Sequence, residues 1–154
     1  MKIRRFRAGD ETALFDVFLS SIRDIASQDY TPQQIAAWAS EDIDPEKWST
    51  QMKTLRPYIV EVDGDIAGYA DVQSDGYIDH FYVSGQHAKQ GVGTLLMSRI
   101  HQEANILGLG ELTANVSKTA ECFFIRQGFH VVERGFPVRK GVILENALMR
   151  KVLV

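Results

Sequence analysis

The residues with the clearest chemical use are two glycines that stand where a strand pattern gives way to a helix pattern. They belong to the stretch KQGVGT, residues 89–94, which follows a polar loop. The N-terminus of a helix exposes unpaired N–H groups with partial positive charge, and small residues let an anion approach that backbone. Lys89 adds a mobile cation beside it. The stretch predicts either a simple turn or a seat for a phosphate. It lacks both the Gly-Lys-Ser/Thr of a P-loop and the GxGxxG of a dinucleotide site.

Acid–base chemistry has its candidates in the apolar strand pattern YIDHFYV, residues 77–83, which precedes the glycines. Asp79 and His80 are adjacent there, so their side chains point to opposite faces of the strand. Asp is uncommon in a central strand, and a buried Asp needs a partner. We therefore give equal weight to two roles for Asp79, a general base and a carboxylate satisfied by backbone or a cation. His80 is expected to be a structural, half-buried residue.

The remaining reactive side chains are expected to be structural. Tyr30 and Tyr82 can donate protons, but packing is the favoured role of both. Cys122 is the only cysteine and stands next to two phenylalanines, so we expect a small buried hydrophobe rather than a nucleophile. The four histidines have no ligand-like spacing, which predicts no metal site.

The periodicity of apolar residues gives the elements that must position these groups. The expected helices are, in chain order, one capped by Asp10, one capped by Thr31 in a capping box with Gln34, one capped by Asp44, one over residues 92–107, and one capped by Ser117. The expected strands cover residues 2–6, 57–63, 66–72, 77–83, 111–116, 128–134 and 142–154. A strand on either side of the 92–107 helix implies a parallel pair within a mixed sheet.

Length and composition indicate one globular domain over residues 1–154. The net charge of -3 gives no reason to expect a nucleic-acid partner. No apolar run is long enough to span a bilayer, and the basic amino end lacks the apolar stretch of a signal peptide. With a single cysteine, no disulfide can form within the chain. These features together favour the cytoplasm.

Two motif regions resemble the GNAT superfamily of acyl-CoA-dependent acetyltransferases. The strand IDHFYV, the loop SGQHAK and the turn QGVGTLL are similar to its motif A, and SKTAECFFIRQGF resembles its downstream helix. The stretch YTPQQIAAWA also resembles a bacterial subgroup of unassigned substrate. The resemblance covers essentially the whole chain. It implies an α/β (α+β) GNAT fold, with a central mixed sheet of about six to seven strands flanked by about four helices.

The resemblance also implies where acetyl-CoA binds as co-substrate. The residues it assigns to the cofactor are Phe81, Tyr82, Val83, Lys89, Gln90, Gly91, Val92, Gly93, Thr94 and Ser117. The pyrophosphate would meet the backbone N–H groups of residues 89–94, and the pantetheine arm would pair like an extra strand along residues 81–83. The Val83 N–H would polarise the thioester carbonyl. Tyr30 and Trp38 fall in the region that forms the acceptor wall in this family.

Three positions depart from the family pattern. Ala88 stands where the family usually has Arg or Gln, which removes a side-chain contact to the phosphates. Ser117 replaces a frequent Asn and reaches less far toward the arm. Phe124 occupies the position of the Tyr that usually protonates the leaving thiolate, and Phe has no proton to donate.

The expected function is therefore direct transfer of acetyl from acetyl-CoA to a primary amine, with Val83 as oxyanion donor and Asp79 as base. A CoA-binding sensor without catalysis is the alternative, because Phe124 replaces the usual acid. A nucleotide-binding protein without acyl chemistry is disfavoured by the missing motifs. GNAT proteins are often dimers, so a homodimer is among the assemblies that the resemblance allows.

Overall fold

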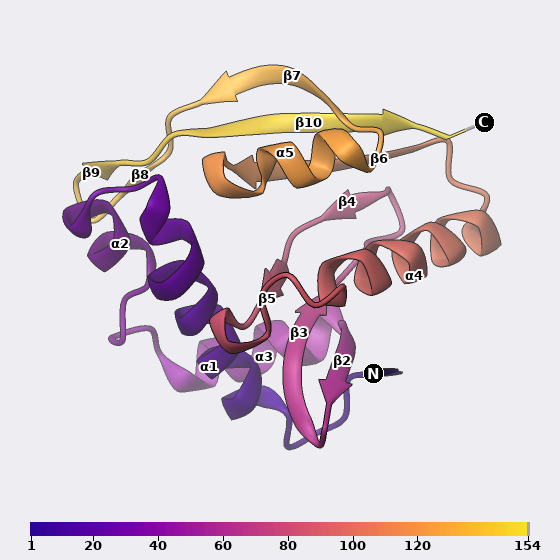
Figure 1. Cartoon of the computed structure of the whole chain (residues 1–154), viewed down its shortest axis with the longest axis horizontal. Coiled ribbons are helices and arrows are strands. Elements are labelled where there is room, and N and C mark those ends of the chain that lie inside the picture. Colours follow the sequence, from indigo (N-terminus) through magenta and orange to yellow (C-terminus); the bar gives the residue numbers. More distant parts are fainter. Residues whose placement is uncertain (154) are drawn as a thin grey trace.

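The computed structural model describes residues 1–153 and divides their strands between two four-stranded sheets and a short hairpin (Figure 1). The first sheet has the order β1 (Lys2–Arg5), β2 (Tyr58–Val62), β3 (Asp65–Ala70), β5 (Phe81–Val83). The second has the order β4 (Tyr77–Ile78), β6 (Glu111–Ser117), β10 (Asn146–Val152), β7 (His130–Gly135). The hairpin joins β8 (Val138–Arg139) to β9 (Val142–Ile143). Val154, the last residue of the expected final strand, lies outside the described residues.

The helices occupy the expected positions. They are α1 (Glu11–Ser20), α2 (Pro32–Trp38), α3 (Pro45–Leu55), α4 (Val92–Leu107) and α5 (Lys118–Arg126). Shorter turns are the π-helix η1 (Ser21–Ile25) and the 3₁₀ turns η2 (Ala26–Gln28) and η3 (Gly85–His87). No helix within residues 1–153 is long and apolar enough to cross a membrane.

Local capping explains where several helices begin. The capping box predicted for α2 is present, with the Thr31 side chain accepting the Gln34 N–H. Asp44 and Ser117 likewise cap α3 and α5. Asp10 stands at the N-cap of α1, but the prediction that its side chain caps the helix is wrong. Its carboxylate instead forms an ion pair with Arg4 at 2.9 Å, where it is held against β1.

Each face of the first sheet has its own core. Val60 of β2 packs with residues of α4 such as Leu96 and Ile100, all fully buried. On the other face Tyr69 packs among residues of α1 and α3, including Leu14 and Trp48. Because strand side chains alternate between faces, one sheet serves both layers. Burial of each large apolar side chain stabilises the fold by about 1.5 to 3 kcal/mol.

The strand expected over residues 77–83 is broken, and its two parts belong to different sheets. Its first part, β4, pairs in parallel with β6, and its second part, β5, pairs antiparallel with β3. The expected parallel pair around α4 is thus present but only two residues long, Tyr77 with Thr113 and Ile78 with Ala114. The mixed α/β architecture is confirmed, whereas the prediction of one continuous strand over residues 77–83 is wrong.

Candidate functional site

A gap opens between the two sheets where β4 gives way to β5. Pairing with β6 ends at Ile78, and β5 forms the outer edge of the first sheet. The Ser84 N–H donates to Ala67 O at 2.8 Å, and His80 O accepts the Asp71 N–H at 3.1 Å. Within residues 80–84, the backbone N–H and C=O groups of the even-numbered residues therefore point toward β3. Because strand polar groups alternate between edges, the N–H and C=O groups of Phe81 and Val83 point into the gap.

One buried carboxylate sits at the break itself. Oδ1 of Asp71 accepts the N–H of Asp79 at 3.0 Å and the N–H of His80 at 2.7 Å. Consecutive N–H groups of a regular strand point to opposite edges, so their convergence on one oxygen interrupts the strand. Asp71 is 1% exposed, and its Oδ2 has no hydrogen-bond partner among the described residues. Burial raises the pKa of Asp71 to about 6.

A cleft of about 690 Å³ runs from this gap to the N-terminus of α4. Of the residues predicted for the cofactor, its walls contain Phe81, Tyr82, Val83, Lys89, Gly91, Val92, Gly93, Thr94 and Ser117. Trp38, predicted for the acceptor, lines it as well. Gln90 does not, and its side-chain oxygen lies 3.4 Å from Nδ1 of His87. The cleft thus joins a free strand edge to a helix N-terminus.

Gly91 and Gly93, at the start of α4, require glycine for different physical reasons. Gly91 is the N-cap with φ of 88°, a left-handed conformation that disfavours side chains. At Gly93 an added Cβ would lie 3.3 Å from the Phe123 ring. No side chain caps the helix, so the first-turn N–H groups of residues 92–94 are available to a ligand.

Two cleft walls were not predicted. One is formed by the π-helix η1, through Ser21, Ile22, Asp24 and Ile25. The other is formed by α5, through Thr119, Ala120, Phe123 and Arg126. A π-helix leaves no distinct signal in the apolar pattern, which continues from α1 without a break, although such turns are frequent at functional sites. On α5 the apolar residues Ala120 and Phe123 line the cleft, whereas Phe124 is buried in the core.

The aromatic residues at the end of the cleft take separate roles. Phe124 is 2% exposed and packs edge-on against Phe81 and Phe129, with ring centroids 5.5 and 5.0 Å apart. Phe123, its neighbour, lies on the cleft wall instead. Tyr82 also lines the wall, and burial raises the pKa of its hydroxyl to about 12, so the group stays protonated at neutral pH.

The two acid–base candidates of the broken strand differ in exposure. The Asp79 side chain is exposed and does not line the cleft, so it is not the buried strand Asp considered from the sequence. His80 is buried, and burial lowers its pKa. Its ring nitrogens lie 3.0 Å from the Tyr69 hydroxyl and 3.1 Å from the Gln51 amide nitrogen. These contacts fit the structural role expected for His80.

Cys122 is exposed on α5, so the expectation of a buried hydrophobe is wrong. The helix turns its Phe124 side to the core, and Cys122, two residues earlier, points to solvent. Cys122 is also absent from the cleft wall. No group of three His, Cys, Asp or Glu residues within the described chain is arranged to hold a metal ion.

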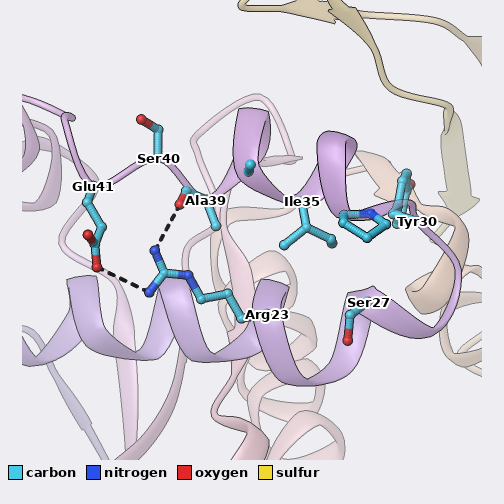
Figure 2. A pocket seen from close by; sticks show the side chains of 9 residues that line it. Arg23, Ser27, Tyr30, Ile35, Ala39, Ser40 and Glu41 are labelled. Carbon is cyan, nitrogen blue, oxygen red and sulfur yellow. Dashed lines mark hydrogen bonds and ion pairs between the residues drawn. The ribbon is translucent and has the colours of Figure 1, made fainter.

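Tyr30 is separated from the cleft and faces a second cavity of about 530 Å³ between η1 and α2 (Figure 2). Arg23 crosses this cavity to the Ala39 carbonyl and the Glu41 carboxylate. The Tyr30 hydroxyl donates to Glu145 O and accepts the Lys118 N–H at 3.0 Å. Its ring packs edge-on against Trp38 at 5.3 Å, so the aromatic pair divides the two cavities.

Comparisons with known proteins identify relatives of the whole chain. Residues 26–146 match the family model described as acetyltransferase (GNAT) domain. The chain is 30% identical over 150 residues to the uncharacterized N-acetyltransferase YafP of Escherichia coli K12, covering 97% of this chain and 95% of that protein. The crystal structure of the GCN5-related N-acetyltransferase (aminotransferase, class-II) from Rhodopseudomonas palustris is 28% identical. It superposes with a TM-score of 0.93 over 99% of this chain and 95% of that one.

More distant structures share the fold. PaiA N-acetyltransferase from Thermoplasma acidophilum, in complex with coenzyme A, is 16% identical with a TM-score of 0.75, over 99% of this chain and 98% of that one. YncA from Salmonella typhimurium, a putative acetyltransferase with its cofactor acetyl-CoA, is 20% identical with a TM-score of 0.72. That match covers 100% of this chain and 94% of that one.

The buried carboxyl of Asp71 predicts a specific dependence of stability on pH. Its pKa is raised from 3.8 to about 6, so the folded chain binds this proton more tightly than the unfolded chain does. The protonated Asp71 carboxyl therefore stabilises the fold relative to its ionised form. This stabilisation is fully present below the pKa of the group in the unfolded chain and is lost as the pH rises through its pKa in the folded chain. Relative to the native protein, Asp71→Asn should gain about 2 to 3 kcal/mol of unfolding free energy from about pH 4 to about pH 7. Urea unfolding across this range measures it, and a pH-independent difference would contradict it.

Proposed function

The chain belongs to the GNAT acetyltransferase family, and from this premise we propose that it transfers acetyl from acetyl-CoA to a primary amine. The amine is carried by a small molecule or a protein, and transfer is direct, within a ternary complex. The observation that carries the proposal is the cleft, which joins the uncapped N-terminus of α4 to the free edge of β5. These two surfaces suit the two ends of a CoA molecule, its pyrophosphate and its amide-containing arm.

The phosphate end of CoA would lie at the start of α4. The N–H groups of residues 92–94 would bind the pyrophosphate, with Lys89 beside them and Arg126 on the α5 wall as cations. Ala88 also lines this part of the cleft and offers only backbone and a methyl group. The two cations are therefore the side chains that neutralise the phosphates in this proposal.

The pantetheine arm would bind along β5 as an additional strand. Its amides would pair with the free N–H and C=O groups of Phe81 and Val83. Ser117, on the opposite wall, already accepts the Ala120 N–H at 3.2 Å. Because a hydroxyl both accepts and donates, the Ser117 O–H proton is still free to bond a carbonyl of the arm.

The chemistry would proceed in one nucleophilic step. The amine, once deprotonated, attacks the thioester carbon, and the Val83 N–H stabilises the negative charge on the carbonyl oxygen. The C–S bond then breaks and the attacking nitrogen loses its second proton to water, giving the amide and the CoA thiolate. Asp79 is the proposed base and would act through water, since its exposed carboxylate lies outside the cleft wall.

Tyr82 is the proposed donor of the proton to the thiolate. The proposal rests on its place in the cleft and on a hydroxyl that stays protonated at neutral pH. Tyr30 is less suited, because its hydroxyl already donates to Glu145 O. Tyr30 would instead support Trp38, which presents an apolar surface to the acceptor. The acceptor would accordingly carry an apolar or aromatic portion close to its amine.

A CoA-binding module without catalysis is the second candidate. Phe124 favours it, because it places a buried phenyl ring where the family usually has the Tyr acid. The two functions share the same cofactor cleft and differ only in turnover.

Acetyl-CoA should raise the melting temperature of the protein. At about 100 times its Kd a ligand adds about 2.7 kcal/mol to the unfolding free energy, or roughly 5 to 10 °C in Tm for a chain of this size. Differential scanning fluorimetry measures the shift, and a thiol reagent then follows CoA release over a panel of amines. No shift would refute the cofactor site, whereas a shift without thiol release would favour the non-catalytic module.

Replacement of Gly91 should weaken CoA binding specifically. Gly91→Val forces a β-branched residue into the left-handed region and places its bulk at the phosphate seat, so Kd for CoA should rise about tenfold or more. Gly108→Val is the matched control, because Gly108 is also left-handed, at the other end of the same helix, with open space around it. Both variants should lose similar stability, and isothermal titration should separate them. Equal CoA affinities would argue against the proposed seat.

The proposed acid and base can be tested by removing one functional group each. Asp79→Asn and Tyr82→Phe should lower kcat, by about 100-fold where the group transfers a proton directly and less where water intervenes. CoA affinity should be unchanged in both. Tyr69→Phe is the control for Tyr82→Phe, because it removes a hydroxyl from the same aromatic cluster outside the cleft. Unaltered kcat in either variant would remove that residue from the mechanism.

A further inference from the structure

The break between β4 and β5 is held by a single side chain that belongs to neither strand. Asp71 follows β3, and its Oδ1 takes the N–H groups of both residues between the two strands, Asp79 and His80. The main chain strengthens the same contact, since the Asp71 N–H donates to His80 O at 3.1 Å. Three hydrogen bonds thus fix this two-residue segment to the end of β3.

The direction of one N–H group shows what the contact prevents. In β4 the Gly76 carbonyl accepts the Thr113 N–H of β6, whereas the Tyr77 carbonyl accepts the Gln73 N–H at the other edge. A regular strand would therefore point the His80 N–H toward β6. Oδ1 of Asp71 accepts this N–H on the β3 side instead. The ladder that starts with Tyr77 and Ile78 therefore loses the donor it needs to continue along β6, and the two sheets separate at this residue.

The second carboxylate oxygen of Asp71 is not stabilised by hydrogen bonds as the first one is. Oδ2 of Asp71 is buried and has no hydrogen-bond partner among residues 1–153. A carboxylate oxygen removed from water without a partner lowers the stability of the fold. Stability alone is thus a poor reason for Asp at this position, whereas the geometry of the break is a sufficient one.

We propose that Asp71 is a positioning residue for the acetyl-CoA site, holding the Asp79–His80 break so that the β5 edge stays open to the pantetheine arm. The inference rests on the proposed function, because it needs CoA to bind along β5. Asp71 itself does not line the cleft and would not touch the cofactor. Its effect would pass through the backbone of the residues that follow the break.

Two substitutions separate the effect of the hydrogen-bond acceptor at residue 71 from the effects of its charge and its volume. Asp71→Leu removes the acceptor and keeps a side chain of similar length, whereas Asp71→Asn keeps a carbonyl oxygen for the two N–H groups. Asp71→Leu should raise the Kd for CoA about tenfold or more, and Asp71→Asn should stay within about threefold of the native protein. Amide hydrogen exchange at Asp79 and His80 should accelerate in Asp71→Leu alone. Should Asp71→Leu fail to fold, Asp71→Ala makes the same comparison.

The control is Val60→Ala, which opens a cavity in the buried core of β2 away from the cleft. At matched loss of Tm it should leave CoA affinity and the exchange of the two amides unchanged. The inference is overturned if Asp71→Leu binds CoA as tightly as Val60→Ala, or if its two amides keep their protection. If the native protein itself binds no CoA, the proposed function fails first, and hydrogen exchange then shows separately whether Asp71 holds the break.

Discussion

A strand cannot pair fully with two sheets that lie apart. This chain meets that constraint by interrupting one strand at Asp79 and His80, so that its two parts pair in different sheets. The hydrogen bonds from their N–H groups to Asp71 allow β4 to belong to one sheet and β5 to the other. Everything proposed for the site depends on this separation. A continuous strand would satisfy its own backbone groups along β6 and leave none for a ligand.

The order of the helices and strands was predictable because it depends on local sequence patterns. The capping box at Thr31 and Gln34, the helix that ends at Gly108 and the two motif regions all depend on residues close in sequence. The family resemblance built on those motifs is confirmed by the comparisons. Most of the residues expected at the cofactor cleft also lie on its walls, because the motif fixes a strand, a turn and a helix N-terminus together.

The features that were not predicted depend on contacts between residues of different elements. The apolar pattern around Asp10 does not show that Arg4, on β1, draws its carboxylate away from the helix end. The alternation in YIDHFYV is that of an unbroken strand, and the break is imposed by Asp71 from a neighbouring strand. The outward position of Cys122 and the wall formed by η1 likewise follow from how helices are oriented against the sheets. Local spacing does not determine such rotations.

The hydroxyl of Tyr30 links three parts of the chain that are remote in sequence. It contacts the first backbone N–H of α5 and a carbonyl just before β10, while its ring supports Trp38 on α2. The wall proposed for the acceptor is therefore fastened to the sheet that carries the other side of the cleft. A cleft whose two walls are joined in this way keeps a nearly constant width. It would therefore select amines by their size and shape and would change its own shape little to bind each one.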